Sequence, residues 1–242
     1  MAEKNKTAVA LAADGAEEIE LVTVVDVLRR GGVETHVMGL GDAAGTVTGG
    51  HGLRLATDGG WDGQRAVAAD MLFVPGGMGG VENLRADPRV LRAIRARAEA
   101  GKDVAAICAG PLVLDAAGVI GEDTAYTCYP GLEVKMKHPD SWQDEVVVRS
   151  DDGIWTSQGP ATAMDLGLAL LDALAGDETG EEVADELLCD RGDVLEFEED
   201  DAEDWFGDEG GDWEDDDLEA DGDWEEGVDG DDAEDGEDGT RE

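Results

Sequence analysis

A cysteine stands where the sequence predicts a sharp turn between a strand and a helix. The apolar run from Asp103 to Ile107 predicts a buried strand, and a proline opens a predicted helix that runs from Pro111 to Ala117. Cys108 lies between them, so its sulfur is expected near unpaired N–H groups and the positive end of the helix dipole. Both effects favour a thiolate, which is a nucleophile and a target for peroxide. The spacing leaves open a small buried cysteine that only fills space.

A glycine-rich turn follows a second predicted strand. The apolar run Asp70–Val74 ends at Pro75–Gly80 (PGGMGG), at the edge of the sheet where α/β folds bind ligands. The turn lacks the Lys-Ser/Thr ending of a phosphate-binding loop. N–H groups at Gly76 and Gly77, with that of Ala109, are expected to form an oxyanion pocket. Taken alone, the turn is also compatible with a plain loop.

Three glutamates follow the first predicted strand, and one of them is a candidate acid. Helix capping and surface solvation account for Glu17 and Glu18. Glu20 differs because it lies between Ile19 and Leu21, on a helix that must pack against the sheet. Buried beside a thiolate, its carboxyl would have a raised pKa and could donate a hydrogen bond to sulfur or move a proton.

No pattern in the sequence predicts a metal or a cofactor. The three histidines have no spacing that joins them to the cysteines or to carboxylates as metal ligands, and they are interpreted as solvated or strand-edge residues: His36, His51 and His138.

Strands and helices alternate along the first part of the chain, which predicts a parallel sheet. Strands are expected at 7–12, 33–40, 70–74 and 103–107, with a hairpin at 146–148 and 154–156. Helices are expected at 17–30, 87–100, 111–117 and 161–174, the second capped by Asp87. In the first of these helices, Ile19, Val22, Val25 and Val27 are the candidate inward positions. The fold class is therefore α/β.

Charge divides the chain into two parts. Residues 1–176 carry a net charge of minus 11, and residues 177–242 carry minus 33, within a total of minus 44 over 242 residues. The first part is predicted to be one folded domain and the second an acidic, disordered tail. This charge disfavours binding to nucleic acid and suits a halophilic cytosol. Acidic-tryptophan pairs in the tail, such as Asp204-Trp205, leave open an interaction arm for a basic partner, although a degenerate acidic tail is the simpler interpretation.

The start of the chain and its cysteines indicate a reducing compartment. The N-terminal apolar run, Ala8 to Ala13, is too short for a signal peptide or a membrane span, which predicts a cytoplasmic location. Three widely spaced cysteines, Cys108, Cys128 and Cys189, form no disulfide framework. At least one thiol is therefore expected to be free.

Several motifs together resemble the ThiJ/PfpI superfamily, and within it the branch of the Parkinsonism-associated deglycase and its bacterial relatives. The resemblance covers about residues 5–175 and is carried by five segments: GAEEIE at 15–20, VDVLRR at 25–30, PGG at 75–77, AAICAGP at 105–111 and TSQGP at 156–160.

The resemblance implies a flavodoxin-like three-layer sandwich of the class I glutamine amidotransferase-like type, with no cofactor and usually a homodimer. It implies Cys108 as the nucleophile, Glu20 as a protonated acid bonded to it, and N–H groups of Gly77 and Ala109 facing the substrate carbonyl. The implied activities are glutathione-independent conversion of methylglyoxal to lactate and removal of early glycation adducts from proteins. Peroxide sensing and chaperone action at the same cysteine are the alternatives.

Two positions depart from the patterns of this superfamily. Where relatives often have a histidine near the nucleophile, this chain has Tyr129, which can donate or accept a hydrogen bond but is a poor base at neutral pH. The peptidase branch has histidine directly after the cysteine, whereas Ala109 stands here. A Cys-His dyad and a PfpI-type peptidase are therefore the weaker interpretations, and Tyr129 is a candidate catalytic residue in place of the histidine.

Overall fold

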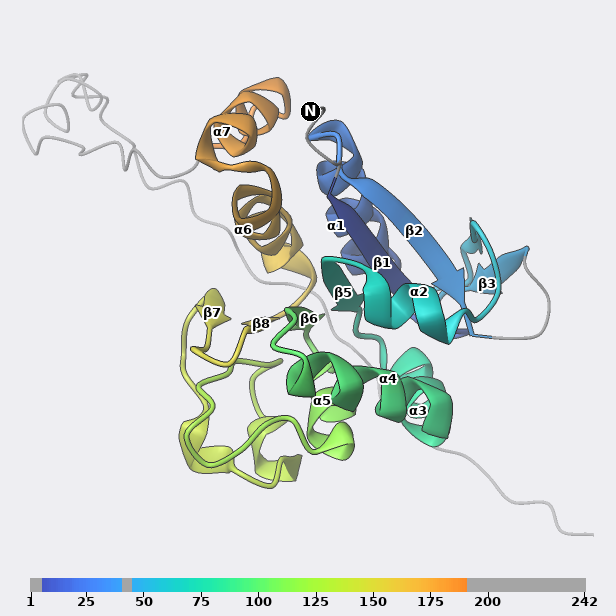
Figure 1. The fold of residues 1–242 in the computed structure, drawn as a ribbon, viewed down its shortest axis with the longest axis vertical. Helices are drawn as coiled ribbons and strands as arrows, with labels where there is room; N and C mark the ends of the chain where they lie inside the picture. The colour runs from blue at the N-terminus through green and yellow to red at the C-terminus, as the bar shows by residue number, and fades with distance from the viewer. Residues whose placement is uncertain (1–5, 41–44, 191–242) are drawn as a thin grey trace, which may run out of the picture. The chain divides into compact units, whose positions relative to one another are not determined.

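A six-stranded sheet forms the centre of the fold. The computed structural model of the chain describes residues 6–40 and 45–190. The strand order is β2-β1-β5-β6-β8-β7, parallel except for the edge pair β7 and β8 (Figure 1). The strands are β1 (Thr7–Ala12), β2 (Glu34–Gly39), β5 (Met71–Val74), β6 (Val104–Ile107), β7 (Val147–Arg149) and β8 (Ile154–Ser157), and a separate hairpin pairs β3 (Thr46–Thr48) with β4 (Arg54–Ala56).

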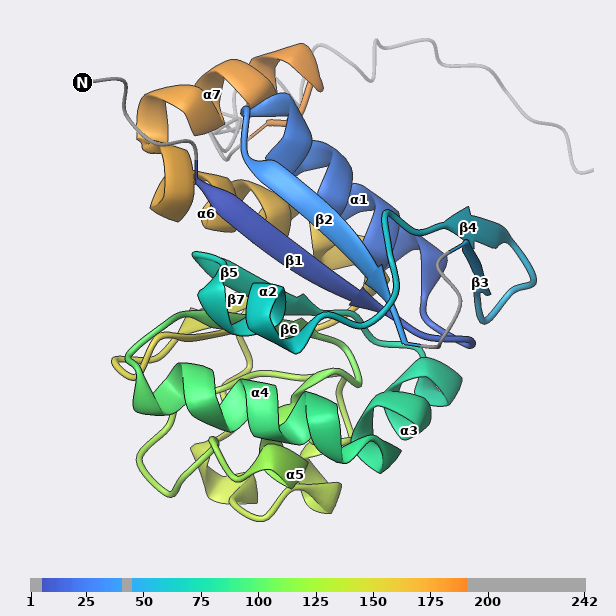
Figure 2. The ribbon, with the colours of Figure 1, turned by 45° about the vertical axis from the view of Figure 1, so that its right-hand side comes forward.

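Helices cover both faces of the sheet, so the fold has three layers (Figure 2). One face is covered by α1 (Glu18–Arg30), α6 (Ala163–Ala175) and α7 (Asp177–Glu186). The other is covered by α2 (Gly63–Ala68), α3 (Met78–Ala86), α4 (Pro88–Glu99) and α5 (Pro111–Ala117). The predicted α/β sandwich with a mostly parallel sheet is confirmed.

Alternation along the strands produces the two cores. In β1, Val9 and Leu11 belong to the core under α2 to α5, whereas Ala8, Ala10 and Ala12 belong to the core under α1 and α6. Both sets are buried, which explains why β1 reads as a continuous apolar run with no polar face. The same division recurs in β5 and β6.

The sequence signals at the start of α4 are confirmed. The Asp87 side chain accepts a hydrogen bond of 2.8 Å from the N–H of Arg89, and Pro88 occupies the first turn, where no intrahelical donor is needed.

Helix α1 faces the sheet with a different side from the one predicted. Ile19 is 56% exposed and Val22 is 50% exposed, so their assignment as inward positions is wrong. Leu21, Val24 and Leu28 are buried instead, together with the predicted pair Val25 and Val27. Apolar residues occur all around this helix, so its pattern alone does not define the side that the sheet and α6 cover.

A further helix continues past the boundary expected at residue 176. Helix α7 occupies Asp177–Glu186, and its Val183 and Ala184 are buried in the core that α6 shares. The expectation of disorder is therefore wrong for these ten residues, because Val183 and Ala184 pack an otherwise acidic helix against the core. The acidic-tryptophan pairs lie outside the described residues. Over the described ranges, no helix has the length and apolar character needed to cross a membrane.

Candidate functional site

Cys108 lies at the end of β6 in a strained backbone conformation. Its φ is 61°, in the left-handed region that non-glycine residues seldom adopt. Two backbone bonds hold it there: its N–H donates to the Ser157 carbonyl at 2.9 Å, and its carbonyl accepts from the Tyr129 N–H at 2.9 Å. Strain of this kind is typical of functional turns, and it directs a half-buried thiol toward the Gly76–Gly77 turn.

Glu20 is completely buried beside this thiol. The N–H of Gly76 donates to its Oε2 at 2.6 Å, whereas its Oε1 has no hydrogen-bond partner in the described part of the chain. The carboxyl and the Cys108 sulfur are nevertheless close enough that each shifts the pKa of the other. Gly76 allows this approach, because a Cβ there would lie 2.7 Å from Glu20 Oε2 and 2.8 Å from the Cβ of Cys108.

Burial governs the proton equilibria of the pair. It raises the pKa of Glu20 to about 7, with the charge of Glu17 adding to the rise and the hydrogen bond from Gly76 and the nearby Cys108 thiol opposing it. Burial also raises the pKa of Cys108 to about 12, and the Glu20 charge adds to that rise. The predicted lowering of the Cys108 pKa is therefore wrong. The N–H groups of Ala109 and Gly77 do lower it, but the seven-residue helix α5 does not compensate for the lost hydration.

The two groups titrate as a unit. Above pH 7 the pair has lost one proton, and the remaining proton lies on sulfur, because the pKa of Cys108 is the higher of the two. A charge on Glu20 opposes a charge on Cys108, so a thiolate forms most easily when its proton passes to the Glu20 carboxylate. That transfer needs no separate base.

The backbone around the sulfur matches the predicted pocket in part. The N–H groups of Gly77 and Ala109 lower the pKa of Cys108, so both lie on the side of the reacting sulfur. Gly77 has a φ of 80° and begins α3, which explains the need for glycine. The N–H of Gly76 is already bonded to Glu20, so this group positions the acid and does not face a substrate.

Tyr129 adjoins Cys108 through its backbone. Its side chain is 51% exposed, and its ring lies at the surface close to Gly159.

Sequence reasoning missed the environment of Glu18 and His51. Glu18 was interpreted as a solvated residue but is 5% exposed, because it accepts bonds from the His51 ring at 3.0 Å and from the N–H groups of His51 and Leu53. The partners are more than thirty residues apart in the chain, so no local pattern signals them. With Glu17, these residues bring three potential ligand atoms within 4.8 Å of one another. Both Glu18 oxygens are already bonded, so we assign no metal to the group.

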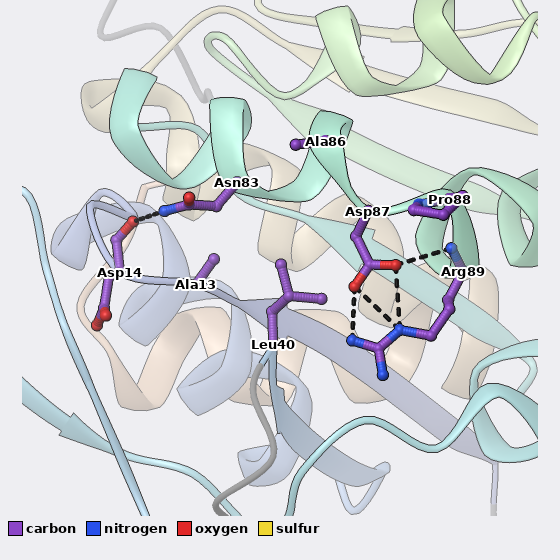
Figure 3. A pocket seen from close by; sticks show the side chains of 8 residues that line it. All are labelled: Ala13, Asp14, Leu40, Asn83, Ala86, Asp87, Pro88 and Arg89. Atoms are coloured by element: carbon purple, nitrogen blue, oxygen red, sulfur yellow. Dashed lines mark hydrogen bonds and ion pairs between the residues drawn. The ribbon is translucent and has the colours of Figure 1, made fainter.

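A separate cavity of about 550 Å³ lies past the ends of β1 and β2 (Figure 3). It contains none of the predicted site residues. Polar groups at its rim are paired with one another, as in the contact from Asn83 Nδ2 to the Asp14 carbonyl at 2.9 Å and the ion pair of Asp87 with Arg89. The cavity is lined by Ala13, Asp14, Leu40, Asn83, Ala86, Asp87, Pro88 and Arg89.

Comparisons with known proteins give consistent matches over the folded part. The profile of the DJ-1/PfpI family matches residues 6–173. Protein dj-1beta of Drosophila melanogaster is 33% identical over 184 residues, which cover 76% of this chain and 97% of that protein. A Caenorhabditis elegans protein named glutathione-independent glyoxalase DJR-1.2 is 33% identical over 179 residues, covering 74% of this chain and 93% of its own length.

Solved structures agree with the sequence relatives. The crystal structure of Drosophila melanogaster DJ-1beta superposes with a TM-score of 0.71 at 32% identity, covering 77% of this chain and all of that one. The structure of Toxoplasma gondii DJ-1, described as oxidized, gives a TM-score of 0.70 at 29% identity, covering 76% of this chain and 98% of that one.

Proposed function

The chain belongs to the DJ-1/PfpI family, and on that premise we propose that it is a cofactor-independent cysteine enzyme that converts methylglyoxal to lactate or removes it from its protein adducts. Its relationship to DJ-1 proteins, one of which is named a glutathione-independent glyoxalase, supports a stress-related function of DJ-1 type. The observation that carries the proposal is the buried Glu20 carboxyl beside Cys108, in a turn where the N–H groups of Gly77 and Ala109 face the sulfur.

The proposed reaction uses the single proton that the pair retains. The Glu20 carboxylate takes the proton of the Cys108 thiol as the sulfur adds to the aldehyde carbon, and the new alkoxide takes that proton from Glu20, which gives a hemithioacetal. The Glu20 carboxylate then removes the hydrogen from that carbon, and the electron pair of the broken C–H bond forms an enediolate whose charge lies on the neighbouring oxygen. The hydroxyl proton passes to that oxygen and Glu20 returns its proton to the neighbouring carbon, leaving a lactoyl thioester. Water hydrolyses the thioester to lactate and frees the thiol. N–H groups of Gly77 and Ala109 stabilise the charge that develops on oxygen, and the Tyr129 hydroxyl bonds to the substrate.

A turnover assay tests this proposal. The purified chain, in concentrated salt and without glutathione, is expected to form lactate from methylglyoxal. Cys108→Ser should abolish the activity, whereas Cys128→Ser is the matched control, because Cys128 is buried and bonds to the Tyr129 carbonyl rather than to Glu20. A fully active Cys108→Ser protein would exclude the mechanism.

Peroxide sensing is the second candidate, and the same geometry supports it. A sulfinate at Cys108 would place two oxygens among the N–H groups of Gly77 and Ala109 and beside a neutral Glu20, which can donate a hydrogen bond. Intact-mass measurement after mild peroxide distinguishes the two: selective gain of two oxygens at Cys108 supports the sensor, and no gain at that residue argues against it.

We also propose a homodimer formed through α1 and the β3–β4 hairpin. Ile19 and Val22 on α1 and Leu53 beside the hairpin are each at least half exposed, an unusual concentration of large apolar side chains for a protein surface. A cavity of about 250 Å³ between α1 and β4 continues this face.

A small carbonyl compound or a glycated protein is the proposed partner of the thiol pocket, and the cytoplasm is the proposed location.

A further inference from the structure

The turn at 49–53, which joins β3 and β4, is bound to the loop that precedes α1. The N–H of Gly15 donates to the Thr48 carbonyl at 2.7 Å, and the N–H of Gly50 donates to the Ala16 carbonyl at 2.9 Å. These bonds fix the hairpin against the backbone that leads into α1.

Glu18 makes the charged contacts of this junction. One oxygen of its carboxylate accepts from the N–H of His51 at 2.8 Å and of Leu53 at 3.3 Å, and the other lies 3.0 Å from His51 Nδ1. Burial acts to raise the pKa of Glu18, but these hydrogen bonds outweigh it and lower the pKa to about 2. Glu18 is therefore charged at any physiological pH. Gly49 lies so close to the carboxylate that a side chain there would overlap with it.

The same loop forms a wall of the thiol pocket. The N–H of Glu17 donates to the Gly76 carbonyl at 3.1 Å, and the N–H of Gly76 donates to Glu20 at 2.6 Å. Gly76 is thus held at its carbonyl by the loop and at its N–H by the acid. A Cβ at Gly77 would lie 2.5 Å from the Glu17 nitrogen, so the loop and the glycine turn are in direct contact.

We propose that Glu18 is a positioning residue for the thiol pocket, and that its ion pair with His51 is the part of this junction that responds to pH. Glu18 holds the hairpin turn, the turn holds the loop before α1, and the loop holds Gly76, whose N–H orients Glu20. The proposal deepens the proposed function, because it assigns a further residue to the same site.

The pH response follows from the groups that face His51. Within a single chain, its ring is 74% exposed and lies 3.0 Å from Glu18 and 3.5 Å from Glu17, both from the start of α1. The bond to Glu18 and the charges of both carboxylates raise the pKa of His51 above its ordinary 6.5. The ion pair is fully formed below pH 6.5 and is lost as the pH rises through the raised pKa. The two N–H bonds to Glu18 remain, so the junction loosens without opening completely.

Alkylation of Cys108 by iodoacetamide tests the proposal without any substrate. The full-length native protein is compared with Glu18→Gln and His51→Gln, and the matched controls are Glu34→Gln, an exposed carboxylate, and His36→Gln. When the Gly76 turn is released, the Cys108 thiol becomes more exposed to water. Its pKa, which burial raises, then falls, so more of the thiol is present as thiolate and alkylation is faster. We expect His51→Gln to react about two- to fivefold faster than native at about pH 6 and at the native rate well above the His51 pKa. Glu18→Gln should react faster at every pH.

Turnover supplies the signature of a positioning residue. Glu18→Gln should lower kcat/KM for methylglyoxal and at the same time accelerate alkylation of the folded protein. Blocked access to the thiol would lower both rates, and unfolding would be visible as a loss of structure. Alkylation rates for His51→Gln that match native at every pH would overturn the pH response. A Glu18→Gln protein that folds and shows native alkylation and native hydrogen exchange in residues 45–57 would overturn the proposal. If no variant, native included, turns over methylglyoxal, the alkylation and exchange results still decide it.

Discussion

We expect the stability of the Glu20→Gln variant, measured relative to that of the native protein, to increase as the pH rises. The glutamine side chain keeps an oxygen that can accept the N–H of Gly76, which now lies 2.6 Å from the carboxyl, but it cannot ionise. The native carboxyl, which is fully buried, must lose its proton in the folded state above pH 7. The difference between the two proteins therefore isolates the free energy of one buried ionisation.

The sign and size follow from the raised pKa. Between pH 4.5, the ordinary value, and about 7, the folded native protein holds a proton at Glu20 that the unfolded chain has released, so rising pH destabilises the folded state. From pH 5 to pH 8 this linkage amounts to about 2.5 kcal/mol, at about 1.4 kcal/mol for each pKa unit. The Glu20→Gln variant does not lose this free energy of unfolding as the pH rises.

Urea unfolding at several pH values measures the effect. Both proteins are unfolded in the same concentrated salt at about pH 5 and about pH 8, and the difference in their free energies of unfolding is compared, because titrating groups that do not interact with Glu20 cancel in it. We expect this difference to shift in favour of Glu20→Gln by about 2.5 kcal/mol on going to the higher pH. A difference that stays constant, or that moves the other way, would refute the claim that burial keeps Glu20 protonated.

Three further substitutions test other parts of the site and the interface. Gly76→Ala should cost about 1–3 kcal/mol of folding free energy in thermal unfolding and lower turnover, because its Cβ would lie 2.7 Å from Glu20 Oε2. Tyr129→Phe should lower kcat/KM about two- to tenfold, the value of one hydrogen bond, without slowing alkylation of the thiol. Val22→Asp should halve the mass measured by light scattering, because it places a charge on the apolar face proposed to join two copies.

Each of these substitutions has a control or an excluding result. Gly45→Ala is the control for Gly76→Ala, since no heavy atom lies within 4 Å of its added Cβ, and equal stability of the two variants would contradict the packing argument. Native kinetics in Tyr129→Phe would remove the hydroxyl from the mechanism. An unchanged mass for Val22→Asp would place the interface elsewhere.

The sequence predicted the elements whose signals are local. The strand ending at Cys108, the helix capped by Asp87, and the glycine turn at 75–80 all rest on neighbouring residues, and the structure has each of them. Buried strands and capped helices are encoded within a few positions, so they can be found from one sequence.

Features that depend on distant partners were missed. The left-handed backbone of Cys108 is held by Ser157 and Tyr129, and the burial of Glu18 depends on His51. The pKa of Cys108 rises, whereas the turn and the helix dipole alone predict a fall, because desolvation by distant segments outweighs both. These properties arise only when segments far apart in the chain meet.

Mass analysis of the protein during turnover tests the central claim most directly. Native protein mixed with methylglyoxal and quenched in acid should carry a mass increase of one methylglyoxal on the peptide that contains Cys108. The Cys108→Ser variant should carry none, and Glu20→Gln should accumulate the adduct because its proton transfer is blocked. Native protein that forms lactate with no adduct at Cys108, or Cys108→Ser protein that forms lactate at the native rate, would contradict the account.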